Sequence, residues 1–349
     1  MPGMDVKKIM RLIDFKHHVQ DKLCSVYNEN ESEVIFYELI ENFLGITKIK
    51  YIVDKEHLIS NSEILILNQK INQLELNEPL QYVIGNKKIF GINFKLNDSV
   101  LIPRPETEEL CSWILSHQLN DIKILDIGTG SGLIALVLKK HIKNSTVDGW
   151  DNSIKALNLA KSNAKKNNIN VNFKLNDIFK KDIPKNEYDL IVSNPPYVSY
   201  DDYNKIHERV KKYEPNNAIF VNDNDLLIFY KIIIKKASIS LRKNGLIFFE
   251  CNEKNIDDVF NVLKDHRFKN IDIKKDFRNK KRINKQAHTL TAEVLEFIYM
   301  GDIFRTRLRV AGNDDFIIKT RNAPDQQRLT AGQKIEIGWL PEDCRALDA

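Results

Sequence analysis

The chain has 349 residues, 42% of them hydrophobic, and a formal net charge of +5. This length suits two or three domains with sizeable cores. The modest charge does not require a nucleic-acid partner, and no apolar run reaches the ~18 residues of a transmembrane helix.

Four cysteines lie far apart, with no Cys-x-x-Cys pair: Cys24, Cys111, Cys251 and Cys344. This spacing argues against a zinc site or a disulfide framework. The first residues lack the apolar core of a signal peptide. We therefore expect a cytoplasmic protein without a membrane segment or a bound metal.

Residues 1–78 are predicted to form an N-terminal helical domain. Apolar residues from Phe36 to Leu44 recur at helical spacing, and Gly45 is placed to end that helix. The next segment, 82–102, alternates apolar and polar residues, with Gly85 and Gly91 near the expected turns. This pattern predicts a β-hairpin.

Residues 79–285 are predicted to form an α/β domain. Strand-like and helical runs alternate, which is typical of a mostly parallel sheet with helices on both faces. Late in this region we expect a helix over 226–241 and a strand over 246–250.

Arg104 lies between two prolines, which restrict the backbone. Glu106 or Thr107 is placed to cap a helix that runs from Glu108 to Leu119. By itself this segment predicts a rigid loop that leads into a helix.

A strand predicted over 123–127 contains Asp126 and leads into a glycine-rich turn before a helix. The turn consists of Gly128, Thr129, Gly130, Ser131 and Gly132. Such glycines let the backbone approach a ligand closely, which predicts a nucleotide-type site. No Lys-Ser/Thr pair follows the last glycine, so the turn is not a triphosphate loop. An ordinary loop between strand and helix is the alternative.

Acidic residues end the next two predicted strands. Asp151 follows the run 146–150 and is placed to accept hydrogen bonds from ribose hydroxyls. Asp177 follows the third strand and can accept from an adenine amino group, while Ile178 and Phe179 can pack on the ring. Each alone is more often a loop acid or a core residue, but their order is specific.

The strand predicted over 188–193 leads into Asn194, Pro195, Pro196 and Tyr197. Asn194 offers a carbonyl acceptor, and Pro195 lacks an N–H beside its own carbonyl. The Tyr197 ring offers a face for stacking. These four residues predict a site that holds a planar –NH2 group, with its nitrogen facing a second ligand.

Composition changes near residue 286. Residues 1–285 contain 38 lysines and 7 arginines, whereas residues 286–349 contain 2 lysines and 6 arginines. The tail also becomes strand-like, and its turns predict a small β-barrel. The predicted strands are Glu293–Tyr299, Arg305–Val310, Phe316–Lys319 and Lys334–Trp339.

The glycine turn, the acids and the Asn-Pro-Pro-Tyr motif follow the order found in class I S-adenosylmethionine-dependent amino-group methyltransferases. Two segments, which begin at Pro79 and at Leu101, carry a further family signature. Together with the motifs above, they make residues 5–285 resemble the HemK-type glutamine N5-methyltransferases. The chain departs from that family at 221–225 and after Glu250, where Cys251-Asn252 replaces the usual Ile-Gly.

This resemblance implies a Rossmann-like class I methyltransferase sheet and S-adenosylmethionine as methyl donor. It implies methylation of the glutamine in the Gly-Gly-Gln loop of peptide chain release factors, with the helical domain helping to bind that partner. Donor binding would fall to the glycine turn, Asp126, Asp151, Asp177, Ile178 and Asn194. Arg104 would form a wall of the pocket. Asn194 and Pro195 would be catalytic, within a substrate site completed by Pro196 and Tyr197.

Three alternatives stay open at this point. A ribosomal-protein glutamine methyltransferase fits the same motifs. A DNA adenine N6-methyltransferase uses the same amino-group site, but no basic base-reading region is evident, and we expect no direct nucleic-acid contact. A non-catalytic binding module with a decayed enzyme body is disfavoured by the intact acids and Asn194.

The tail resembles a TOBE domain, the small β-barrel that ends the ATPase subunit of spermidine/putrescine-type importers. The resemblance rests on Tyr299–Asp302 and on Ile337–Asp348. Because no Walker A motif occurs in the chain, transport is not expected. The tail is interpreted as a genuine fused module, a recombination scar or an assembly error, and the shift in lysine and arginine usage favours a foreign origin without choosing among the three.

Overall fold

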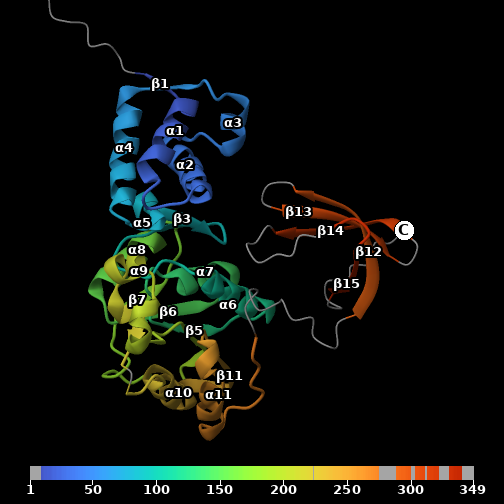
Figure 1. Ribbon diagram of the computed structural model, residues 1–349. Coiled ribbons are helices and arrows are strands. Elements are labelled where there is room, and N and C mark those ends of the chain that lie inside the picture. Colours follow the sequence, from blue (N-terminus) through green and yellow to red (C-terminus); the bar gives the residue numbers. More distant parts are fainter. Residues whose placement is uncertain are drawn as a thin grey trace, which may run out of the picture. The chain divides into compact units, whose positions relative to one another are not determined.

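The structure is a computed structural model that describes residues 9–222, 224–274, 288–299, 303–310, 313–321 and 330–339. The chain forms two compact units, Met1–Asp272 and Ile273–Ala349 (Figure 1). The border predicted between residues 285 and 286 lies outside the described residues.

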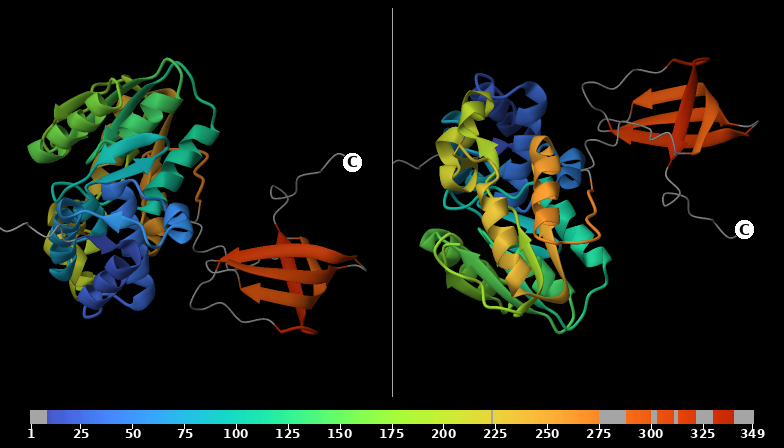
Figure 2. Two further views of the ribbon diagram at one scale, coloured as in Figure 1. Left: turned by 90° about the horizontal axis from the view of Figure 1, so that it is seen from above. Right: turned by 90° about the horizontal axis from the view of Figure 1, so that it is seen from below.

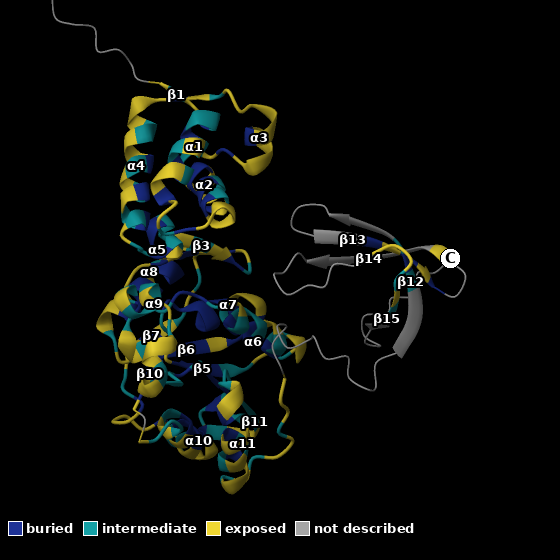
Figure 3. Cartoon of the chain, viewed as in Figure 1, coloured by how far each residue is buried: buried dark blue, intermediate teal, exposed yellow. Residues whose placement is uncertain are grey.

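The first unit begins with a group of helices, as the apolar spacing predicts. Its elements are β1 (Met10–Arg11), α1 (Leu12–Leu23), α2 (Glu29–Leu44), α3 (Lys48–Val53), β2 (Leu58–Ile59), α4 (Asn61–Glu75) and α5 (Leu80–Ile84). A capping box formed by Asn28 and Glu31 starts α2, and Gly45 ends it in the left-handed conformation. Helix α4 buries Leu67 and Ile71 on one side and exposes its other side (Figure 3). The helices therefore share a core of their own.

The hairpin is shorter than the predicted range of 82–102. Only β3 (Asn86–Ile89) and β4 (Ile92–Lys95) pair, and Gly91 lies in the turn with a φ of 71°. The placement of Gly85 near a hairpin turn is wrong, because this glycine ends α5. The residues around Tyr82 form a helical turn instead of extending the strand.

A parallel sheet of five strands lies at the centre of the first unit. Its order is β7–β6–β5–β8–β11, and every neighbouring pair is parallel. The strands are β5 (Lys123–Ile127), β6 (Thr146–Asp151), β7 (Asn172–Leu175), β8 (Tyr188–Ser193) and β11 (Leu241–Phe249). Strand order reverses between β5 and β8, and ligands bind at such a switch point in open α/β sheets.

Helices cover both faces of this sheet, as expected. Helices α6 (Pro105–Ser116), α7 (Leu133–His141) and α8 (Ile154–Lys166) pack in one buried cluster with Ile124 and Leu190. On the other face, Leu125 and Ile191 pack with Ile233 of α10 (Ile228–Ser240). Neighbouring strand residues point to opposite faces, so both faces of each central strand are buried.

A single side chain of α8 joins the hairpin to the glycine turn. The Oδ1 atom of Asn163 accepts a hydrogen bond from the backbone N–H of Lys95 at 2.7 Å. Its Nδ2 atom donates to the carbonyl oxygens of Lys95, at 3.2 Å, and of Ser131, at 2.9 Å. Asn163 is fully buried, so these bonds are shielded from water.

The remaining elements of the first unit follow β8 and β11. They are β9 (Val198–Ser199), α9 (Glu208–Tyr213), β10 (Phe220–Val221) and α11 (Ile256–Asp265), with short 3-10 turns between them. The predicted helix over 226–241 is confirmed as α10. Within the described ranges, every helix is too short or too polar to cross a bilayer.

The second unit contains an antiparallel sheet of four strands in its described residues (Figure 2). The order is β14–β13–β12–β15, formed by β12 (His288–Tyr299), β13 (Ile303–Val310), β14 (Asn313–Arg321) and β15 (Lys334–Trp339). Val294, Leu308 and Val310 are buried. Each predicted strand of the tail overlaps one of these four.

Candidate active site

The glycine turn joins the end of β5 to the start of α7. The N–H groups of Gly128 and Thr129 both donate to the carbonyl oxygen of Trp150, at 2.8 and 2.9 Å. Gly128, Gly130 and Gly132 have φ values of 76°, 55° and 83°, which are left-handed and favour glycine. The turn is therefore fixed against the end of β6, whose last residue is Asp151.

Asp126 lies beneath this turn and is fully buried. Its Oδ2 atom accepts hydrogen bonds from the Thr129 hydroxyl at 2.6 Å and the Ala135 N–H at 3.2 Å. No described residue donates to its Oδ1 atom. Burial raises the pKa of Asp126 to about 7, although the two hydrogen bonds lower it. Asp126 thus joins the turn to the first residues of α7 from below.

Asp151 holds the turn from the side. Its Oδ2 atom accepts from the Gly130 N–H at 2.9 Å, and its Oδ1 atom accepts from the Ser153 N–H at 2.8 Å. Burial raises the pKa of Asp151, and these backbone donors oppose the rise. A carboxylate held by two N–H groups keeps further lone pairs with which to accept from a ligand hydroxyl.

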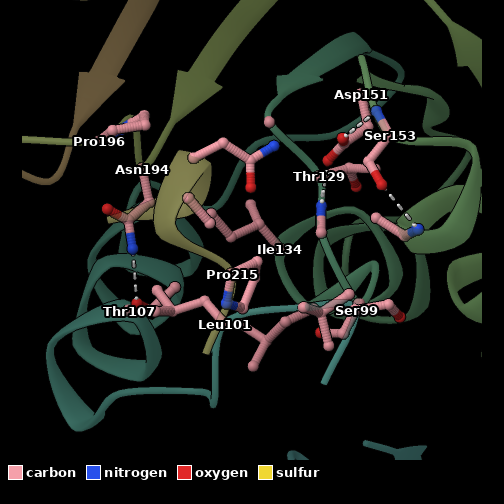
Figure 4. A pocket seen from close by; sticks show the side chains of 18 of the residues that line it. Ser99, Leu101, Thr107, Thr129, Ile134, Asp151, Ser153, Asn194, Pro196 and Pro215 are labelled. Carbon is pink, nitrogen blue, oxygen red and sulfur yellow. Dashed lines mark hydrogen bonds between the residues drawn. The ribbon is translucent and has the colours of Figure 1, made fainter. Parts of the chain in front are cut away.

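Two cavities share several lining residues at this end of the sheet, and Figure 4 shows the larger of them. The larger has a volume of about 150 Å³ and the smaller about 50 Å³. Gly128, Asp151, Asn152 and Phe229 line both. The larger cavity is also lined by Thr129, Gly130, Ser131, Arg104, Thr107, Asn194 and Pro196.

The smaller cavity brings together the residues predicted to hold a purine. Asp177, Ile178 and Phe179 line it with Trp150 and Phe229. A hydrogen bond from the Phe179 N–H, at 2.9 Å, is the largest cause that lowers the pKa of Asp177. An ionised acceptor thus lies beside apolar and aromatic walls, which suits a flat base with an amino group.

Asn194 follows β8 on the far side of the switch point. Its Nδ2 atom donates to the Thr107 hydroxyl at 3.0 Å, as Figure 4 shows, and the Thr107 hydroxyl donates to Glu250 Oε2 at 2.7 Å. The Tyr197 hydroxyl donates to Glu250 Oε1 at 3.2 Å. Glu250 stands directly after β11, and its carboxylate accepts hydrogen bonds from two other segments, α6 and the residues after β8.

The other predicted residues of this motif are placed differently. Pro196 lines the larger cavity, whereas Pro195 and Tyr197 are not among the residues that line either cavity. The hydroxyl of Tyr197 is bound to Glu250, and its ring packs in a buried cluster with α10 and α11. Gly132 is not among the residues that line either cavity, and an added Cβ there would be 3.3 Å from side-chain atoms of Ala160 and Phe173.

Arg104 lines the larger cavity and is paired with a buried acid. Its guanidinium donates to Glu214 Oε1 at 2.6 Å, and Glu214 Oε2 accepts from the Ile102 N–H at 3.0 Å. The capping role expected of Glu106 or Thr107 is wrong, because α6 begins at Pro105 and has no side-chain cap. Thr107 instead turns its hydroxyl toward Asn194 and Glu250.

Comparisons with known proteins agree with this geometry. Residues 108–212 match the family model described as the methyltransferase small domain, and residues 276–347 match the TOBE domain. A release factor glutamine methyltransferase of Flavobacterium psychrophilum is 37% identical over 281 residues, which cover 79% of this chain and 99% of the relative. Relatives with the same name from Bacteroides thetaiotaomicron and Thermodesulfovibrio yellowstonii are 34% and 36% identical. The alignment with the Bacteroides relative covers 76% of this chain and 96% of the relative. The alignment with the Thermodesulfovibrio relative covers 78% of this chain and 97% of the relative.

The chain belongs to the release factor glutamine methyltransferase family. Its methyl donor is S-adenosylmethionine, and the two adjoining cavities suit that molecule. Asp151 lines both cavities, and Asp177 lines the smaller one. Among the described residues, no group of three or more His, Cys, Asp or Glu side chains is arranged to hold a metal ion.

The sequence did not single out several residues of this methyltransferase site. Thr107 and Glu250 complete the hydrogen bonds around Asn194, and Asn152 and Phe229 line both cavities. Asn152 and Glu250 directly follow β6 and β11, so the rule that ligands bind at the carboxyl ends of parallel strands could have found them. Phe229 lies in the first turn of α10, and no motif distinguishes it from a core aromatic residue.

Proposed function

We propose that this chain transfers a methyl group to the side-chain amide nitrogen of the glutamine in the Gly-Gly-Gln loop of peptide chain release factors. One observation carries the proposal: Asn194 lines the same cavity as the glycine turn, and its Nδ2 atom is bound to Thr107. The amide therefore presents its carbonyl oxygen as the acceptor for a substrate –NH2 group.

The chain's part in the reaction is to hold and aim the substrate. An amide nitrogen is a poor nucleophile because its lone pair is delocalised into the carbonyl. We assign the two substrate protons to Asn194 Oδ1 and to the carbonyl oxygen of Pro195, which together fix the nitrogen. Pro196 and Tyr197 complete this site. Positioning of this kind supplies a large part of many enzymatic rate enhancements.

We assign donor binding to Asp126, Asp151, Asp177, Ile178 and Asn194, together with the turn from Gly128 to Gly132. When bound, S-adenosylmethionine supplies a methyl group on a positively charged sulfur. Asp126 supports the turn from beneath, while Asp151 and the smaller cavity receive the ribose and the adenine. The glycines have no Cβ atoms, so the donor can approach the backbone of the turn closely. An added Cβ at Gly128 would be 4.0 Å from the backbone carbonyl oxygen of Asn194.

Domain roles and borders are part of the same proposal. Residues 1–78 recognise the release factor, 79–285 carry the methyltransferase, and 286–349 form a TOBE-like segment whose strands β12 to β15 belong to a small barrel of importer type. We infer a cytoplasmic protein that contacts neither membrane nor nucleic acid directly. In support, three cysteines are free thiols among the described residues, and translation termination takes place in the cytoplasm.

Replacing Asn194 with alanine tests the central assignment. Asn194→Ala should lower kcat for release factor methylation by about 100-fold or more, because one positioned polar group contributes that much in comparable sites. The Kd for S-adenosylmethionine, measured by calorimetry, should change much less than kcat, because the glycine turn, Asp151 and Asp177 still hold the donor. Asn42→Ala on the exposed side of α2 is the control. Unchanged turnover in Asn194→Ala would contradict the assignment.

The substrate is tested with labelled donor and three purified acceptors. We expect methylation of a release factor and none of ribosomal proteins or of adenine-containing DNA. Label on a ribosomal protein alone or on DNA alone would replace the proposed substrate with that acceptor.

A further inference from the structure

Glu250 and Thr107 form a chain of hydrogen bonds that ends at Asn194. The Thr107 hydroxyl has a single proton, and it donates this proton to Glu250 Oε2 at 2.7 Å. The Thr107 oxygen can then only accept, and the group that faces it at 3.0 Å is the Nδ2 of Asn194. Burial raises the pKa of Glu250, whereas hydrogen bonds with Thr107, Tyr197 and Asn194 lower it. When Glu250 is ionised, its carboxylate sets the direction of the bond from Thr107.

We propose that Thr107 and Glu250 are positioning residues that fix which end of the Asn194 amide faces the substrate. An ionised carboxylate accepts hydrogen bonds and donates none, so it forces the Thr107 hydroxyl to point toward it. The hydroxyl oxygen then selects the –NH2 end of Asn194. The carbonyl oxygen is left to accept from the substrate amide. The inference rests on the proposed function, because it concerns the same amide.

The surroundings of Glu250 fit this role. The Tyr197 hydroxyl donates to Oε1, and the Tyr230 hydroxyl donates to the backbone carbonyl of Glu250 at 2.9 Å. Both carboxylate oxygens therefore have neutral donors, and α6, β11 and the segment after β8 are joined at one point. Thr107 is only 7% exposed, so water does not compete easily for its hydroxyl.

An asparagine without such a partner can present either end of its amide with similar ease. If the amide turned over, its –NH2 group would face the substrate –NH2 group, and two donors would meet. A wrong orientation removes the acceptor that holds the nucleophile without disturbing the donor pocket. The expected signature is a loss in kcat with donor affinity unchanged.

Thr107→Val tests the inference because valine has the shape of threonine but no hydroxyl. We expect kcat for release factor methylation to fall by about 10- to 100-fold. The Kd for S-adenosylmethionine and the KM for the release factor should stay within about twofold, since Thr107 acts through Asn194. Thr107→Ser, which restores the hydroxyl, should recover most of kcat. Ser112→Ala removes a hydroxyl from the exposed side of the same helix and should behave as wild type.

A second readout does not depend on activity. The side-chain –NH2 group of Asn194 gives a pair of amide resonances, which Asn194→Asp identifies by their loss. Thr107→Val should shift this pair and speed its exchange with water, and Thr107→Ser should leave it near the wild-type position. If Thr107→Val does not fold, Glu250→Gln takes its place, with an expected loss in kcat of about tenfold because a neutral acceptor binds the hydroxyl more weakly.

The outcomes separate the two proposals. If the wild-type enzyme does not methylate release factors, the proposed function is wrong. The Asn194 side-chain resonances then test the hydrogen bonds of Thr107 and Glu250 without reference to activity. If release factors are methylated but Thr107→Val keeps both wild-type kcat and the wild-type Asn194 resonances, the positioning role is overturned. A loss of kcat that Thr107→Ser does not recover would also overturn it.

Discussion

Asp126 places a carboxyl group where water does not reach. Its hydrogen bonds to Thr129 and Ala135 stabilise the turn, yet its second oxygen accepts from no described residue. A buried carboxyl without a cationic partner favours its protonated form. The pocket's geometry therefore depends on a side chain that is costly to ionise.

This cost gives a pH dependence to stability. Burial raises the pKa of Asp126 from 3.8 to about 7 in the folded chain. Folding thus takes up a proton between these values, so the contribution of Asp126 is fully present below about pH 4 and is lost as the pH rises through about 7. Asp126→Asn does not titrate and keeps one carbonyl acceptor.

The measurement is urea unfolding of both chains at about pH 5 and about pH 8. The free energy of unfolding of the wild type should fall relative to that of Asp126→Asn by roughly 3 kcal/mol between these conditions. Parallel profiles for the two proteins would show that Asp126 is ionised in the folded state at both values.

The sequence identified candidate site residues where they lie at the carboxyl end of a predicted strand. Asp151 is the last residue of β6, Asp177 and Asn194 follow β7 and β8, and the structure brings all three to the two cavities. The contact between Thr107 and Glu250 joins positions 143 residues apart. Such a bond depends on how α6 packs beside β11, and no local pattern in the sequence contains that information.

Glycine turns are the elements on which this site depends most directly. Gly45 and Gly132 both adopt left-handed backbone conformations, with φ values of 67° and 83°. They differ in their surroundings, since an added Cβ at Gly45 would meet no atom within 4 Å. At Gly132 it would lie 3.3 Å from side-chain atoms of Ala160 and Phe173.

The pair Gly45→Ala and Gly132→Ala separates backbone strain from crowding. Gly45→Ala should cost about 1 kcal/mol of unfolding free energy, the price of a left-handed alanine. Gly132→Ala should cost about 1–3 kcal/mol more and weaken S-adenosylmethionine binding, because α7 must move away from α8 and β7. Equal losses in denaturant unfolding and unchanged donor affinity would argue against crowding at Gly132.

Element boundaries were predicted least well where polar residues interrupt a strand. The strand predicted over 246–250 is β11, which extends back to Leu241. Leu241 pairs with Tyr188 and Leu246 with Leu190, so the intervening segment bulges out of register. Its Arg-Lys-Asn-Gly sequence reads as a turn, and Asn244 indeed has a φ of 64°. The sequence analysis predicted the strand only from Leu246, and it placed Leu241 at the end of the preceding helix instead of in β11.

At the scale of the whole molecule, the chain divides into two compact units, and its two family matches are to different families. The relative from Flavobacterium psychrophilum aligns over 99% of its own length with 79% of this chain. The TOBE match covers residues 276–347, and the second compact unit begins at Ile273. The shift in lysine and arginine usage predicts a border near residue 286, and the exact position of that border stays a prediction.

Truncation after residue 285 tests whether the enzyme needs its tail. The shortened chain should keep kcat for release factor methylation and the Kd for S-adenosylmethionine within about twofold, because independently packed units fold alone. Thermal unfolding of the methyltransferase unit should also be unchanged. Insolubility of the shortened chain, or a large loss of activity in a folded one, would assign the tail a role in the enzyme.

The hydrogen bonds of Asn163 couple two segments that lie outside its own helix. Because one amide is bonded both to Lys95 of the hairpin and to the carbonyl of Ser131 in the turn, neither backbone can loosen without disturbing the other. Binding of S-adenosylmethionine to the turn should therefore reduce the backbone motion of the hairpin. Deuterium uptake at the Lys95 amide, outside both cavities, would then report whether the pocket is filled.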